Sequence, residues 1–197
     1  MSKTNVVSGL IIESERLRLE VPALEHYDAW AEAHRKVGGK QVEFGPKPRD
    51  PERCCLEDYE ALLKQIVPLL AAQNIPMHVI RKEDGALLGV VSLFDRVGGP
   101  SQSVFIGYRI FSSHWRQGYA TEAVRAAVEA AFTVFDLHRV EACVELNNAA
   151  SIAVLDKLGF RREGLSKRRL RLREDWRDVW VYAMTSEERG HVWTQSP

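Results

Sequence analysis

Apolar and polar residues alternate over several short segments of the chain, which is the pattern of a strand that buries one face. Leu17, Leu19 and Val21 alternate with charged residues, and the runs 77–81 and 87–94 flank a polar turn that predicts a hairpin. The strands predicted from this pattern span residues 17–21, 77–81, 87–94, 104–111, 139–146, 160–172 and 176–184. We expect the last two to form a longer final hairpin.

Apolar residues at helical spacing predict the helices. Asp50-Pro51 has the residue types of an N-cap and a first helical position, and Pro68 should kink or end the helix that begins there. Gly159 is a natural C-cap. The predicted helices span residues 23–36, the segment after Asp50, 118–135, 148–158 and a short stretch in 186–193. The inner face predicted for 118–135 consists of Ala123, Ala127, Ala130, Ala131 and Val134.

This order of elements predicts an α/β (α+β) fold in a single domain over residues 1–197, because no repeat or linker-like boundary divides the chain. The central sheet should be mixed and mostly antiparallel, with helices on both faces. The strand–helix–strand unit 104–146 should contribute one parallel pair through a right-handed crossover.

Composition narrows the possible classes of protein. Lys and Arg total 27, as do Asp and Glu, so the formal net charge of the 197 residues is zero, which argues against a general nucleic-acid or membrane-surface binder. The three cysteines, Cys54, Cys55 and Cys143, form no Cys-x-x-Cys pair and predict neither a disulfide framework nor a zinc site. No long apolar run or signal peptide is evident, so we expect a cytoplasmic protein with a flexible segment 1–9.

The polar loop before helix 118–135 is a candidate phosphate site. Gly118 and Ala120 would let a ligand approach the backbone where the N–H groups of the helix's first turn are free. The spacing matches neither the dinucleotide glycine motif nor the P-loop. An ordinary helix start is the alternative interpretation.

Four blocks in this order resemble the GNAT N-acetyltransferase superfamily, and most closely its branch of ribosomal-protein N-terminal (alanine/serine) acetyltransferases. The blocks are Gly107-Tyr108-Arg109-Ile110, Trp115-Arg116-Gln117-Gly118-Tyr119-Ala120-Thr121-Glu122-Ala123, Asn148-Ala149-Ala150-Ser151 and Leu158-Gly159-Phe160. The opening segment 12–19 also resembles that branch, so the resemblance covers about residues 10–193. It implies a GNAT-like domain in which two parallel strands splay apart, and acetyl-CoA as cosubstrate.

The resemblance also implies which residues hold acetyl-CoA. The amides around Gly118 and Ala120 would bind the pyrophosphate, an amide near Ile110 would polarise the thioester carbonyl, and Asn148 would bind the cofactor arm or cap its helix. Trp115 departs from the family motif, which has Gln or Arg there. The cofactor-binding residues expected on this basis are Ile110, Phe111, Ser112, Arg116, Gln117, Gly118, Tyr119, Ala120, Thr121 and Asn148.

The catalytic residues are less fully specified. Many members of the family protonate the leaving thiolate with a tyrosine, but Leu155 occupies that position here. In the branch that this chain resembles, the matching serine is proposed to protonate the thiolate, so the resemblance implies Ser151 as the acid, with solvent as its rival. The sequence does not single out a general base, and Glu145, near the end of the predicted strand 139–146, is the first candidate. A protein α-amine has a pKa of about 7.7–8.0 and loses its proton readily near neutral pH. The other candidates for the base are Glu141, His78 and His114.

Together these features predict an acetyl-CoA-dependent N-acetyltransferase in which a primary amine attacks the thioester directly. The expected acceptor is a protein N-terminal α-amine, for example that of a ribosomal protein. The alternatives are a small-molecule amine (a polyamine, an aminoglycoside or a metabolite) and a non-catalytic acetyl-CoA-binding module. We expect no metal, no membrane or nucleic-acid partner, and a monomer or homodimer. The basic segment 161–173 is interleaved with acidic residues and should be a solvated face or an acceptor contact.

Overall fold

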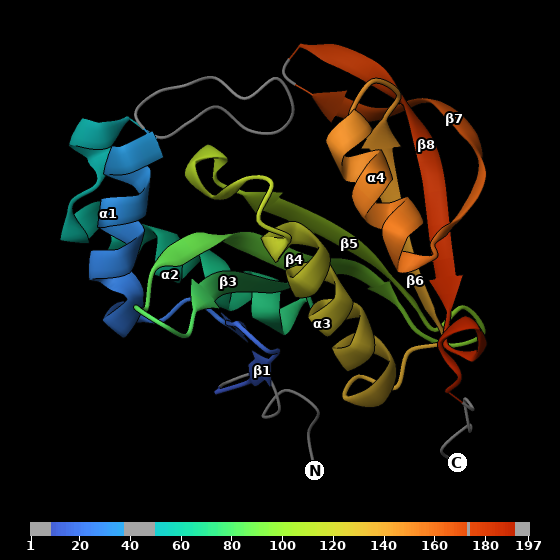
Figure 1. Cartoon of the computed structure of the whole chain (residues 1–197), viewed down its shortest axis with the longest axis horizontal. Helices are drawn as coiled ribbons and strands as arrows, with labels where there is room; N and C mark the ends of the chain where they lie inside the picture. Colours follow the sequence, from blue (N-terminus) through green and yellow to red (C-terminus); the bar gives the residue numbers. More distant parts are fainter. Residues whose placement is uncertain (1–8, 38–49, 173, 192–197) are drawn as a thin grey trace.

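The computed structural model of the chain describes residues 9–37, 50–172 and 174–191. Its strands form one sheet in the order β1-β2-β3-β4-β5-β6-β8-β7 (Figure 1), and every pair of neighbours is antiparallel except β5 and β6. The strands are β1 (Ile11–Glu13), β2 (Leu17–Glu20), β3 (Ile75–Arg81), β4 (Leu87–Val97), β5 (Ser103–Ile110), β6 (Arg139–Glu145), β7 (Arg161–Leu172) and β8 (Asp175–Thr185). The predicted mixed sheet with one parallel pair is confirmed.

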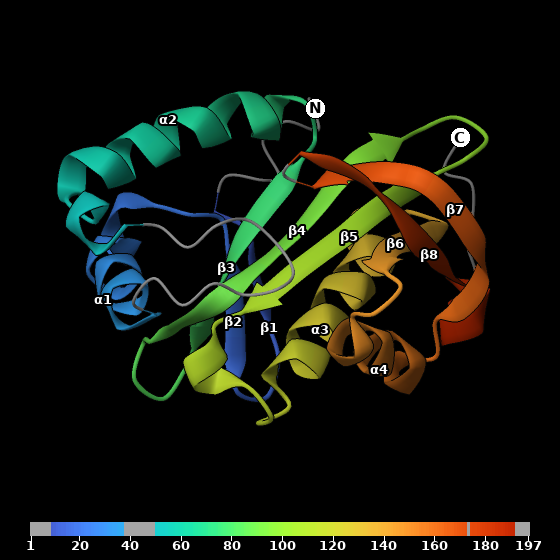
Figure 2. The same cartoon turned by 90° about the horizontal axis from the view of Figure 1, so that it is seen from above.

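Helices cover both faces of this sheet (Figure 2). Helices α3 and α4 lie on one face, where Ala123, Ala127 and Ala131 of α3 are fully buried in the main core. Helices α1 and α2 lie on the other, over a smaller core that contains Trp30 and Tyr59. The helices are α1 (Tyr27–Val37), α2 (Leu56–Ala71), α3 (Tyr119–Thr133) and α4 (Ala149–Leu158).

Several details differ from the sequence prediction. Strand β1 was not predicted, because its three residues are too few to show an alternating pattern. Asp50 caps only a short 3-10 turn over Pro51–Arg53 by accepting a hydrogen bond from Glu52 N at 3.0 Å, and α2 begins later, at Leu56. Pro68 does not end α2, which continues to Ala71. A proline in the last turn removes only one backbone hydrogen bond from a helix that is about to stop.

The ends of two other predicted elements also change. Val134 is not on the inner face of α3 but 47% exposed, because it is the C-cap at which the chain turns away. The predicted final helix is a 3-10 turn over Glu187–Arg189, and residues 192–193 lie outside the described part. The predicted flexible segment 1–9 also falls outside it, apart from Gly9. Within the described ranges, no helix is long and apolar enough to cross a membrane.

The parallel pair β5–β6 opens along its length, as the resemblance implies. The two strands pair only over Ser103–Phe105 and Arg139–Glu141. Beyond that point β5 stays with β4 as far as Ile110, and β6 stays with β8 as far as Glu145. Figure 1 shows the two strands diverging. We call the space between Tyr108–Ile110 and the end of β6 the splay.

Candidate active site

The splay presents free backbone groups of β5. Phe111 N donates to Leu88 O at 2.8 Å, so this N–H points toward β4. Because hydrogen bonding alternates along an antiparallel strand, the N–H groups of Tyr108 and Ile110 point the other way, into the splay. The indole of Trp115 donates to Ile110 O at 2.7 Å, which leaves the amide of Ile110 as the open group at this end. The Ile110 N–H, which the resemblance implies as the carbonyl-polarising donor, therefore points into the splay.

The loop between β5 and α3 ends in a backbone suited to an anion. Arg116 and Gly118 both have left-handed φ angles, of 61° and 82°. Gly118 is the N-cap of α3, and the N–H groups of the helix's first turn have no partner within the helix. A Cβ at Gly118 would meet only the Arg16 guanidinium, at 3.4 Å, so the left-handed backbone rather than crowding favours glycine. Ala120 and Thr121 follow in the first turn, and Arg116 and Gln117 are exposed beside it.

An ion pair from the start of the chain holds this loop in place. Arg16 donates through its backbone N and its Nε to the carboxylate of Glu122, at 2.7 Å each, and through Nη1 to Gln117 O at 3.1 Å. Its guanidinium also lies over the Tyr119 ring, 4.6 Å from the centroid. Burial opposes ionisation of Glu122, but the hydrogen bonds from Arg16 and Ser14 outweigh it and lower the pKa of Glu122. The sequence analysis missed Arg16, although the opening block of the resemblance contains it.

The side chains of two expected cofactor-binding residues, Phe111 and Tyr119, pack inside the protein. The Phe111 ring is buried under α1, its N–H is bonded to β4, and its carbonyl accepts from His114 N at 2.9 Å. The Tyr119 side chain is 7% exposed and packs in the main core. These two residues support the neighbouring backbone, whereas Ser112 is half-buried at the start of the loop.

On the other side of the splay, the first turn of α4 carries Ser151. Asn148 is the N-cap of α4, and its Oδ1 accepts from Ser151 N at 3.1 Å. The Tyr108 hydroxyl lies 2.8 Å from the Ser151 hydroxyl and 3.2 Å from Ser151 O, and its single proton can be donated to either oxygen. Burial raises the pKa of Tyr108 to about 12, against a smaller opposing effect of Ser151. A neutral phenol on β5 thus holds the expected acid, a contact that the sequence analysis did not predict.

The candidates for the general base are separated by their surroundings. Glu145 is half-buried at the open end of β6, whereas Glu141 is held by Arg139 at 2.9 Å. His78 is 3% exposed beneath α2, and burial lowers its pKa to about 3. Burial also lowers the pKa of His114. Glu145 therefore stays the predicted base.

Cys143 lies in the middle of a strand, where a core position would be expected, but it belongs to neither hydrophobic core. It is half-buried on the face of β6 that points away from the main core, to which Ala142 and Val144 belong. Burial raises the pKa of its thiol, which does not favour a nucleophilic role. Within the described residues no group of three or more His, Cys, Asp or Glu side chains could hold a metal ion.

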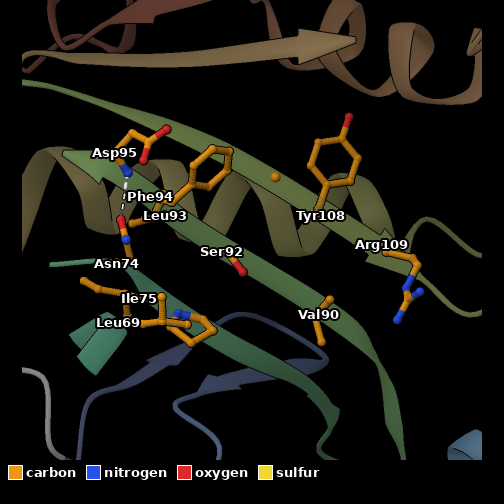
Figure 3. A pocket seen from close by; sticks show the side chains of 12 residues that line it. Leu69, Asn74, Ile75, Val90, Ser92, Leu93, Phe94, Asp95, Tyr108 and Arg109 are labelled. Atoms are coloured by element: carbon orange, nitrogen blue, oxygen red, sulfur yellow. Dashed lines mark hydrogen bonds between the residues drawn. The ribbon is translucent and has the colours of Figure 1, made fainter. Parts of the chain in front are cut away.

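A cavity of about 460 Å³ lies beside the splay, on the face of the sheet opposite to α3 (Figure 3). Ser92 and Gly107 belong to its floor, and Leu69 at the end of α2 contributes to its wall. A Cβ at Gly107 would come within 3.1 Å of the Phe94 ring, so the glycine makes room for that ring. Because Gly107 and Arg109 lie on the strand that lines the splay, this cavity is the candidate site of the acceptor.

Comparison with known proteins agrees with this geometry. The family model "Acetyltransferase (GNAT) domain" matches residues 16–161. A "Probable N-acetyltransferase YjcK" of Bacillus subtilis is 38% identical over 110 residues, which span 56% of this chain and 61% of that protein, less than two thirds of its length. The "[Ribosomal protein uS5]-alanine N-acetyltransferase" of Escherichia coli is 26% identical over 173 residues, covering 87% of this chain and 89% of that protein.

Among solved structures, Mycobacterium smegmatis RimJ in complex with CoA-disulfide superimposes with a TM-score of 0.76 at 28% identity, covering 87% of this chain and 83% of that one. The family model spans the splay, the loop before α3 and the whole of α4 in one continuous match. The chain belongs to the GNAT acetyltransferase family.

Proposed function

We propose that this protein is an N-acetyltransferase that transfers the acetyl group of acetyl-CoA to a protein N-terminal α-amine. The observation that carries the proposal is the splay, which ends at the N-terminus of α3 and opens beside a cavity. The unpaired edge of β5 can form hydrogen bonds with the amide groups in the arm of acetyl-CoA. The free N–H groups in the first turn of α3 can bind its pyrophosphate. Membership of the family supports acetyl-CoA as the donor.

In this proposal the residues of the loop and of β5 position the donor. The amides of residues 118–121 bind the pyrophosphate, and the exposed edge of Tyr108–Ser112 pairs with the arm. The Ile110 N–H donates to the thioester oxygen as negative charge develops there. One such preorganised donor contributes about 10²–10³ in rate.

The reaction then forms a C–N bond and breaks the C–S bond. The amine loses its proton to Glu145 or to water, which requires little basicity because an α-amine is already partly neutral near pH 7.5. Ser151 gives its hydroxyl proton to the leaving sulfur and recovers one from water, while the Tyr108 hydroxyl donates to Ser151 Oγ across 2.8 Å and orients it. Holding the amine against the polarised carbonyl supplies much of the remaining acceleration.

The choice of a protein N-terminus is supported by the relatives. The Escherichia coli relative is named for acetylating an alanine of ribosomal protein uS5, and it aligns with 87% of this chain. The cavity beside the splay provides space for the first residues of a peptide. From the sequence we expect three segments to shape the acceptor site: residues 34–55, the loop 95–103 and the final hairpin. Of the first segment, residues 38–49 lie outside the described residues.

A panel of acceptors tests the proposal. The protein is mixed with acetyl-CoA and peptides with N-terminal Ala, Ser or Asp, with spermidine and an aminoglycoside as comparison, and the release of free CoA thiol is followed. We expect release with peptides. Turnover of spermidine or the aminoglycoside alone would show that the acceptor is a small-molecule amine and not a peptide. Tight acetyl-CoA binding without turnover of any amine would indicate a non-catalytic module.

A further inference from the structure

Arg109 is a half-buried cation that forms no ion pair with the residues the structure describes. It follows Tyr108 on β5, and the two side chains project from opposite faces of the strand (Figure 3). Its Nε is buried and has no hydrogen-bond partner. Its guanidinium lies 5.5 Å from the centroid of the Phe111 ring, and no carboxylate of the described residues forms an ion pair with it. Burial alone lowers the pKa of Arg109.

Such an arrangement is unfavourable for the free protein. A buried charge is normally paired, because desolvation of an unpaired ion costs more than the remaining contacts return. Arg139, which is also half-buried, follows that rule by binding Glu141 and Glu163. A guanidinium that lacks such a partner is matched in geometry by a ligand carboxylate, which can accept two parallel hydrogen bonds.

The position of Arg109 connects this cation to the chemistry. Arg109 lines the cavity, and the following residue is Ile110, whose N–H points into the splay. Consecutive Cα atoms are about 3.8 Å apart, so the backbone that carries Arg109 adjoins the N–H that is expected to face the thioester. Among the described residues that line the cavity, the other charged one is Asp95, which is exposed at the opposite end in Figure 3. The end of the cavity nearest the splay is therefore positive.

We propose that Arg109 binds a carboxylate of the acceptor, so that the preferred acceptors carry a carboxylate within about one residue of the reacting amine. This inference rests on the proposed function and specifies its substrate class. The carboxylate can be the side chain of an acidic first residue of a peptide or the α-carboxylate of a free amino acid. Both place one negative charge next to one primary amine.

Pairs of acceptors that differ only in a carboxylate distinguish these two origins of the negative charge. One arm compares C-terminally amidated peptides that begin with Asp or Asn, and with Glu or Gln. The other compares alanine with alaninamide. For each pair, kcat/KM is measured at saturating acetyl-CoA for the wild-type protein, Arg109→Gln and Arg109→Lys. The control is Arg125→Gln, which removes the same charge from an exposed position on α3.

We expect the wild-type protein to favour the carboxylate acceptor at least tenfold in one arm, and Arg125→Gln to keep that ratio. Arg109→Gln should lower the ratio at least fivefold, and Arg109→Lys should lower it less. Equal kcat/KM for acid and amide acceptors in both arms would overturn the proposal. So would an Arg109→Gln variant that loses the same factor on both members of each pair.

Binding of the products tests the inference without turnover. Calorimetry in the presence of CoA compares N-acetylaspartyl with N-acetylasparaginyl peptides, and N-acetylalanine with its amide. Tighter binding of the acid that disappears in Arg109→Gln would support the carboxylate site even if no amine were acetylated, in which case only the proposed function fails. Turnover of peptides without any charge preference would refute the carboxylate site and leave acetyl transfer standing.

Discussion

The contact between Ser151 and Tyr108 predicts a pair of coupled mutations. In the competent arrangement the Ser151 hydroxyl points its proton at the leaving sulfur, so its oxygen must accept from Tyr108 across the 2.8 Å contact. Ser151→Ala removes the acid. Tyr108→Phe removes only the group that orients it. The double variant removes both.

The magnitudes follow from the chemistry of each group. A general acid contributes about 10²–10⁴ in rate, and a thiol with a pKa near 8.5 leaves readily, so we expect Ser151→Ala to lower kcat by about 10². One hydrogen bond contributes about 0.5–1.5 kcal/mol, so Tyr108→Phe should lower kcat by roughly threefold to tenfold. In the double variant the tyrosine has nothing left to orient, and kcat should equal that of Ser151→Ala.

Single-turnover acetyl transfer on the best acceptor measures these rates where chemistry limits them. Acetyl-CoA affinity, measured by calorimetry, should change little. The Ser151→Ala variant should remain folded, because the Tyr108 hydroxyl can still donate to Ser151 O, 3.2 Å away. Full turnover by the Ser151→Ala variant would show that water, and not Ser151, protonates the leaving thiolate. Rate losses that multiply in the double variant would show that Tyr108 does not act through Ser151.

Three further predictions concern the donor site and the acceptor. Gly118→Asp should weaken acetyl-CoA binding at least tenfold in calorimetry. Gly190→Asp is a control with a similar φ of 79° and should not weaken it. Equal acetyl-CoA affinities of the two variants would contradict a pyrophosphate site at Gly118. Arg16→Gln should weaken acetyl-CoA binding several-fold because the loop loses its tie to Glu122, and unchanged affinity in a folded variant would contradict this role. The logarithm of kcat/KM should rise with pH to about 8, as the α-amine deprotonates, and then level off; a rise continuing to pH 9.5 with activity on lysine or spermidine alone would exclude a peptide N-terminus.

The sequence predicted those parts of the fold that depend on local patterns. Helix α3 begins one residue after Gly118, and α4 lies between its N-cap Asn148 and Gly159, because capping residues act on their immediate neighbours. The opening of β5 from β6 came from the family resemblance. The alternation of apolar and polar residues in β5 and β6 does not reveal this opening, because it would be the same if the two strands paired along their whole length.

Contacts between distant segments could not be predicted in the same way. Arg16 and Glu122 are 106 positions apart, and Tyr108 and Ser151 are 43 apart. Nothing in either segment alone indicates its partner, because such pairs form only when the sheet brings their strands and helices together. The lack of an ion pair between Arg109 and the described residues could not be predicted for the same reason, because it depends on every side chain that surrounds the cavity.

The splay leaves a length of unpaired strand inside the protein's own sheet. Exposed edges of this kind pair with other chains and favour aggregation. If the arm of acetyl-CoA occupies the edge at Tyr108–Ile110, donor binding completes the sheet and thereby stabilises the native state. At a donor concentration of 100 times Kd the gain is about 2.7 kcal/mol, roughly a hundredfold fewer unfolded molecules. The supply of acetyl-CoA would then govern the lifetime of the protein against proteolysis as well as its rate of turnover.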